Sequence, residues 1–129
     1  MREKEIKIIL NYLPPSVNEA YSGYRVRHKS KAYLDFLRNL EAWFLQAEKN
    51  YKISGDSWLA VDYTFYFPLY FKNWKIRKRD LWNFEKVLTD WLSHFIPWFD
   101  DEKIKVINLR KNDCEKWEEK TIIRIYEIL

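Results

Sequence analysis

The chain has 129 residues, 47% of them apolar and 33% charged, which suits one globular domain over residues 1–129 with a core of its own. With Cys114 as the only cysteine and with two histidines, the composition excludes an intrachain disulfide and argues against a zinc site of the Cys/His type. No signal-peptide pattern or long apolar run is present, so we expect a cytoplasmic protein without a membrane partner.

The first predicted strand covers residues 5–13, where apolar residues alternate with polar ones. Pro14 and Pro15 end it, because proline lacks the amide hydrogen that a strand ladder needs. The segment from there to Lys29 is polar, basic and rich in tyrosine, without an apolar period. We expect it to be a functional loop.

The first predicted helix starts after Ser30, a suitable N-cap, and carries apolar residues at three- and four-residue spacing from Tyr33 to Ala47. A long second strand follows, in which the residues from Leu59 to Phe67 alternate between a buried and a more polar face. Pro68 either ends this strand or places it at a sheet edge.

The second predicted helix begins after the basic residues 69–79 and ends at Pro97. One side of it is apolar, and the opposite side carries Trp82, Lys86, Asp90 and Ser93. Two more strands, roughly 103–109 and 117–128, are joined by the turn-like pair Asn112-Asp113. The sequence therefore predicts a single α+β domain of order βαβαββ, with two helices packed on a small mixed four-stranded sheet.

Charged residues bracket the second helix. The cations Lys72, Lys75, Arg77, Lys78 and Arg79 precede it, and a second basic cluster contains Arg25, Arg27, Lys29 and Lys31. Two such clusters favour a polyanionic partner, although each cluster taken alone is equally well explained as solvated loop.

Carboxylates stand at both ends of the same helix: Asp80 at the N-cap position, and Asp100 and Asp101 before the third strand. Such oxygens, in a basic surrounding, suit Mg²⁺ bound through one or two carboxylates and substrate phosphates. Lys86 is placed to contact the phosphate. The alternative is that Asp80 only caps the helix and that the Asp-Asp pair only forms a turn.

These residues resemble the RusA-like Holliday junction endodeoxyribonucleases. The resemblance lies in Pro14-Pro15-Ser16-Val17-Asn18, in Tyr21, and above all in Arg79-Asp80-Leu81-Trp82-Asn83 with Lys86, Asp90 and Asp100-Asp101. It implies a homodimer that cuts four-way DNA junctions with Mg²⁺ or Mn²⁺. It further implies Asp80 and Asp101 as catalytic metal ligands with Asp100 beside them, Lys86 as a catalytic lysine, and Asp90 and Asn83 as supporting residues.

Trp82 departs from this pattern, because the family has an aspartate there and a tryptophan cannot bind Mg²⁺. Glu85 or Asp100 could supply the lost carboxylate. The alternative is a protein that binds branched DNA without cutting it. A third interpretation, a module whose basic clusters contact acidic protein surfaces, also stays open.

The candidate DNA contacts fall into two chemical classes. Tyr21, Tyr24 and Trp82 are candidates for stacking on unpaired bases. The candidates for phosphate contact are the cations Arg25, Arg27, Lys29, Lys75, Arg77, Lys78 and Arg79.

Overall fold

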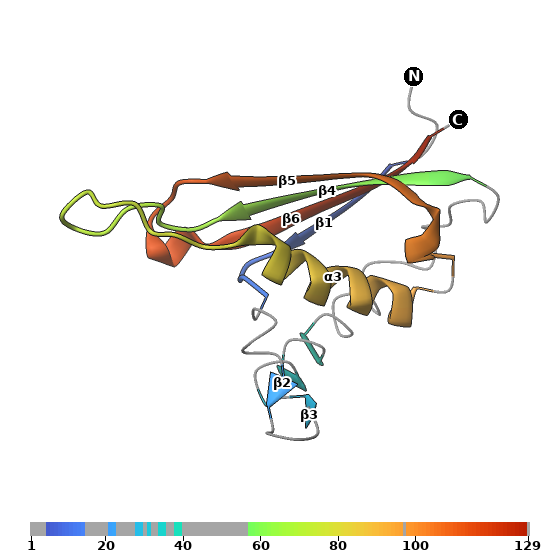
Figure 1. The fold of residues 1–129 in the computed structure, drawn as a ribbon, viewed down its shortest axis with the longest axis horizontal. Helices are drawn as coiled ribbons and strands as arrows, with labels where there is room; N and C mark the ends of the chain where they lie inside the picture. The colour runs from blue at the N-terminus through green and yellow to red at the C-terminus, as the bar shows by residue number, and fades with distance from the viewer. Residues whose placement is uncertain are drawn as a thin grey trace.

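The computed structural model describes residues 5–14, 21–22, 28–29, 31, 34–35, 38–39, 57–96 and 98–128. Its centre is a four-stranded sheet of order β1-β6-β4-β5 (Figure 1). The strands are β1 (Glu5–Leu10), β4 (Trp58–Tyr66), β5 (Ile104–Asn112) and β6 (Lys120–Ile128). β4 and β5 are parallel and the other two pairs are antiparallel, so the predicted mixed sheet is confirmed.

β4 is the central strand, hydrogen-bonded to β6 on one side and to β5 on the other. The predicted alternation is confirmed, because Leu59, Val61, Tyr63 and Phe65 are all buried. Of the two roles considered for Pro68, the edge position is wrong. The strand simply ends at Tyr66, before the proline.

Helix α3 (Leu81–Phe95) covers one face of the sheet, with Asp80 as N-cap and Ile96 as C-cap. Its apolar side is buried against the sheet through Phe84, Val87, Leu88, Trp91 and Leu92. Val87 was missing from the predicted stripe. Pro97, predicted to end the helix, lies outside the described residues, and the helix stops at Phe95.

The last two strands, predicted to be joined at the turn-like Asn112-Asp113, do not pair with each other. β4 lies between them, and their connection contains the 3-10 helix η2 (Lys116–Glu118). The burial pattern gives the reason. β6 buries Thr121, Ile123 and Ile125 completely, as a central strand does, whereas β5 is partly exposed along its whole length, as an edge strand is.

β1 is shorter than predicted: it ends at Leu10, although Tyr12 still packs against the core. The segment predicted as a loop contains two short paired strands, β2 (Tyr21–Ser22) and β3 (His28–Lys29). Most of the first predicted helix lies outside the described residues. Those described within it, 31, 34–35 and 38–39, are helical and exposed, so the number of long helices stays a prediction.

The described residues form no helix that is both long and apolar enough to cross a membrane.

Candidate active site

The exposed side of α3 presents Trp82, Lys86 and Asp90, which are four residues apart and therefore lie one above another, about 6 Å apart along the axis. Trp82 is 60% exposed, and Lys86 and Asp90 are also exposed. The predicted polar side of the helix is thus confirmed for these three residues, whereas Ser93, also predicted there, is half-buried with its Oγ inside. An aromatic ring, a cation and a carboxylate face the solvent in one row.

Asp90 and Asp101 are electrostatically coupled. The pKa of Asp90 is raised, first by desolvation and further by the Asp101 carboxylate, while Lys86 acts in the opposite direction. Asp101 opens the 3-10 helix η1 (Asp101–Lys103), which contacts α3. The structure therefore brings together Lys86, Asp90 and Asp101, the last two from segments on either side of the helix end.

Asp80 and Asp100 are both capping residues. Asp80 Oδ1 accepts a hydrogen bond of 3.0 Å from the Trp82 amide, and Asp100 Oδ1 accepts one of 2.9 Å from the Glu102 amide. The predicted N-cap position of Asp80 is therefore confirmed, and Asp100, which was predicted only to form a turn, caps η1 in the same way. Each cap uses one carboxylate oxygen, which leaves the other oxygen available to a ligand.

Asp80 stands apart from the coupled acidic pair. Ten residues of helix separate it from Asp90, a rise of about 15 Å. Asp80 lines a shallow cavity of about 420 Å³ with Leu109 and Lys111 at the carboxyl end of β5, whereas Asp101 precedes the start of that strand. Figure 1 shows these two places at opposite ends of α3. That Asp80 and Asp101 bind one cation stays a prediction.

Glu85, considered as a substitute for the missing aspartate, is engaged beside the sheet. Its Oε1 accepts a hydrogen bond of 2.7 Å from the Thr89 hydroxyl, which lies 2.8 Å from the buried Tyr63 hydroxyl. Asn83 is half-buried, and its backbone N–H donates a hydrogen bond to the backbone carbonyl of Asp80. The side chain of Glu85 is therefore already held by the sheet-facing network.

Within the described part of the chain, no three His, Cys, Asp or Glu side chains gather into a group that could hold a metal ion. Asp90 and Asp101 are two of these acids, and the negative charge of Asp101 helps to raise the pKa of Asp90. At phosphoryl-transfer sites Mg²⁺ is held by one or two carboxylates, with phosphate oxygens completing the shell.

The segment 69–79, here called the basic hairpin, extends beyond the end of the sheet (Figure 1). A bridge between Tyr70 and Ile76 and hydrogen bonds from Phe71 N to Lys75 O (2.8 Å) and from Arg77 N to Leu69 O (2.7 Å) give it a defined shape. It contains five Lys or Arg residues and no Asp or Glu. A structured, acid-free projection of this kind attracts polyanions.

The predicted cations of the basic hairpin divide into two groups. The Arg77 and Arg79 guanidinium groups lie over aromatic rings, 4.3 Å from the Phe71 centroid and 5.1 Å from the Phe67 centroid. Lys75 and Lys78 are exposed. The arginines therefore help to hold the hairpin's shape, and the lysines point their charge at the solvent.

Trp74, at the tip of the basic hairpin, was not among the predicted contacts. It is 80% exposed, and its φ of 66° lies in the left-handed region that non-glycine residues rarely occupy. Its ring centroid is 6.1 Å from that of Tyr70. In the sequence, only the neighbouring cations pointed to a role for Trp74. Its exposure could not be predicted, because it follows from the position of Trp74 at the tip of the folded hairpin.

The second predicted basic cluster is described only in part. The backbone of Tyr21 pairs with that of Lys29 in the β2–β3 ladder. Tyr24, Arg25 and Arg27 lie outside the described residues, so their role as DNA contacts stays a prediction.

A family model described as "Endodeoxyribonuclease RusA" matches residues 12–126. The match includes the basic hairpin, α3 and η1, and hence every described residue of the candidate site. No curated protein gives a significant match to the chain.

The coupling around Asp90 predicts opposite pKa changes in two variants. Asp101→Asn should lower the pKa of Asp90, because it removes a negative neighbour, and Lys86→Gln should raise it, because it removes a positive one. Carboxyl ¹³C NMR titration of Asp90 measures both changes. Glu102→Gln is the control for a general loss of charge, and shifts of the same sign in Asp101→Asn and Lys86→Gln would contradict the arrangement.

Proposed function

The chain belongs to the RusA family of endodeoxyribonucleases, and from that premise we propose that it hydrolyses phosphodiesters of four-way DNA junctions with Mg²⁺ or Mn²⁺. The observation that supports the proposal is that Lys86 and Asp90, on the exposed side of α3, lie beside η1, which begins with Asp101. This grouping adjoins a helix whose N-terminus follows directly on the basic hairpin.

In this proposal Asp90 and Asp101 hold the metal ion, and Lys86 contacts the scissile phosphate. When bound, the ion lowers the pKa of its water and stabilises the leaving oxygen. The lysine neutralises charge that develops on the phosphate oxygens. Asp80 fixes the start of α3 through its cap, and Asp100 does the same for η1.

We include a homodimer in the proposal. A two-fold pair presents two equivalent sites, which suits paired cuts in strands of like polarity across a junction. A second copy could also place its own Asp80 next to the Asp90–Asp101 pair, which the length of α3 prevents within one chain.

The basic hairpin is the proposed junction-binding element. Its lysines contact phosphates, and the Trp74 ring stacks on a base left unpaired at the branch point. Because the hairpin ends at Asp80, DNA bound to it lies next to the row of Trp82, Lys86 and Asp90.

One observation favours a second candidate function, junction binding without cleavage. Trp82 presents an exposed aromatic ring where the resembling family has a carboxylate, one helical turn from Lys86. The described acidic residues lack a third member for the metal group. In this alternative the basic hairpin and Trp82 bind DNA, and the acidic pair is inert.

Cleavage depends on Asp101 if the proposal holds. Asp101→Asn should reduce nicking of a synthetic four-way junction in Mg²⁺ or Mn²⁺ by roughly 100-fold, because a charged ligand is lost. Glu102→Gln, a change at the exposed neighbouring acid, should leave nicking intact. Junction binding without cleavage in the unaltered protein would instead establish the second candidate function.

Restoring the carboxylate at position 82 should strengthen cleavage in the proposed homodimer, where the second copy brings the start of its own α3 to the Asp90–Asp101 pair; within one chain, positions 82 and 90 are about 12 Å apart along the helix. Trp82→Asp should raise the nicking rate roughly tenfold, corresponding to about 1.4 kcal/mol of transition-state stabilisation. Asparagine has nearly the same size as aspartate but no charge, so Trp82→Asn should not raise the nicking rate. Equal rates for both variants would mean that the missing carboxylate does not limit the reaction.

The tip of the basic hairpin should contribute to junction affinity by stacking. Trp74→Ala should weaken binding to a four-way junction roughly tenfold, and binding to duplex DNA far less, because only the junction offers unstacked bases. Trp117→Ala is the matched control, since Trp117 is 83% exposed on η2. Equal loss in both variants, measured by fluorescence anisotropy, would argue against stacking.

A further inference from the structure

The face of the sheet opposite α3, here called the outer face, carries side chains in rows set by the strand register. Lys7, Arg124, Asp62 and Asn108 form one row across all four strands. In the next row Thr64 of β4 lies beside Arg110 of β5. The row after it contains Lys120, Tyr66 and Asn112. Hydrogen-bond donors from all four strands therefore gather on one surface.

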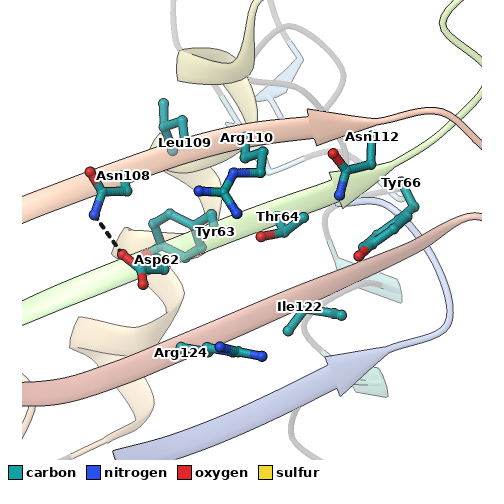
Figure 2. A pocket seen from close by; sticks show the side chains of 10 residues that line it. All are labelled: Asp62, Tyr63, Thr64, Tyr66, Asn108, Leu109, Arg110, Asn112, Ile122 and Arg124. Atoms are coloured by element: carbon teal, nitrogen blue, oxygen red, sulfur yellow. Dashed lines mark hydrogen bonds between the residues drawn. The ribbon is translucent and has the colours of Figure 1, made fainter.

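A groove of about 280 Å³ lies on the outer face between Arg110 of β5 and Arg124 of β6, with Thr64 and Tyr66 of β4 beneath it. Figure 2 shows Arg110 and Asn112 reaching from β5 over β4, and Arg124 lying along β6. The groove walls thus offer guanidinium, amide and hydroxyl groups, which are the side chains that contact phosphate oxygens in nucleic-acid complexes.

The charges of the outer face leave an excess of cations. The single acid lining the groove, Asp62, already accepts a hydrogen bond of 2.8 Å from Asn108 Nδ2. Glu5, at the rim, lies 4.0 Å from Arg124 Nε. In the described part of the chain no acidic side chain pairs with Arg110, so its charge is available to a ligand.

We infer that the outer face is a second phosphate-binding surface, and that its occupant is the backbone of a nucleic-acid arm other than the one at the candidate site. This inference rests on the proposed function for the identity of the nucleic acid. The sheet separates the two surfaces, since α3, the helix that carries Lys86, packs on its opposite side (Figure 1). A branched substrate has arms that leave in different directions, so one protomer holds two of them.

The test uses the full chain and a synthetic four-way junction. The double variant Arg110→Gln/Arg124→Gln should make the plot of log affinity against log salt less steep by about 1.8, because two phosphate contacts are lost at about 0.9 each. The double variant Arg110→Lys/Arg124→Lys keeps the charges and should keep the slope. The control Lys105→Gln/Lys116→Gln removes two exposed charges outside the groove and should also leave the slope unchanged.

Other outcomes overturn the inference in distinguishable ways. An unchanged slope in the Arg110→Gln/Arg124→Gln variant, with normal junction nicking, removes the second surface and leaves the proposed function intact. A changed sedimentation coefficient with an unchanged slope makes the outer face an interface between copies of the chain. Absence of any salt-dependent junction binding by the unaltered protein removes both the inference and the proposed function.

Discussion

The packing of α3 on the sheet is the constraint that fixes the candidate site. Phe84, Leu88, Trp91 and Leu92 are almost completely buried, and the Phe84 and Phe65 ring centroids are 5.2 Å apart. Rotating the helix by one residue, about 100°, would carry Lys86 toward the core and leave a buried charge without a partner. The hydrophobic contact therefore determines which side chains of α3 face the solvent, and it leaves Asp90 partly desolvated.

Residues 58–95 form one continuous stretch that links the three surfaces proposed to bind DNA: the outer face, the basic hairpin and the exposed side of α3. β4 contributes Thr64 and Tyr66 to the outer face, continues into the basic hairpin, and leads through Asp80 into α3. The base of the hairpin is tied to the far end of β5, because Asp113 Oδ1 accepts a hydrogen bond of 2.9 Å from the Leu69 amide. The surfaces thus keep fixed orientations relative to one another through the central strand and this hydrogen bond.

Sequence periodicity predicted the elements whose burial is one-sided. Alternation in β4 and the spacing from Phe84 to Leu92 both reflect a single buried face, and each was recognised for that reason. Strand neighbours were not predictable in the same way. The crossover through α3 sets β5 beside β4 and leaves the more completely buried β6 for the interior, an order that follows from tertiary packing.

The candidate site shows the same division. Asp80, Lys86 and Asp101 could be selected from residue types and spacing, and both caps follow from local backbone chemistry. The coupling of Asp90 with Asp101 depends on where η1 returns to α3, and the groove on the outer face depends on a register between strands far apart in sequence. Such tertiary juxtapositions leave no periodic signal in a single sequence.

The backbone at Trp74 has a consequence for how the basic hairpin is tuned. A left-handed φ of 66° costs a bulky residue on the order of 1 kcal/mol or more, a cost that glycine or asparagine would avoid. The hairpin would therefore fold more favourably with a smaller side chain at its tip. The ring of Trp74 lies almost entirely in solvent, so it adds little to the stability of the fold. A tryptophan at the tip therefore costs stability in exchange for its proposed role in stacking on a base.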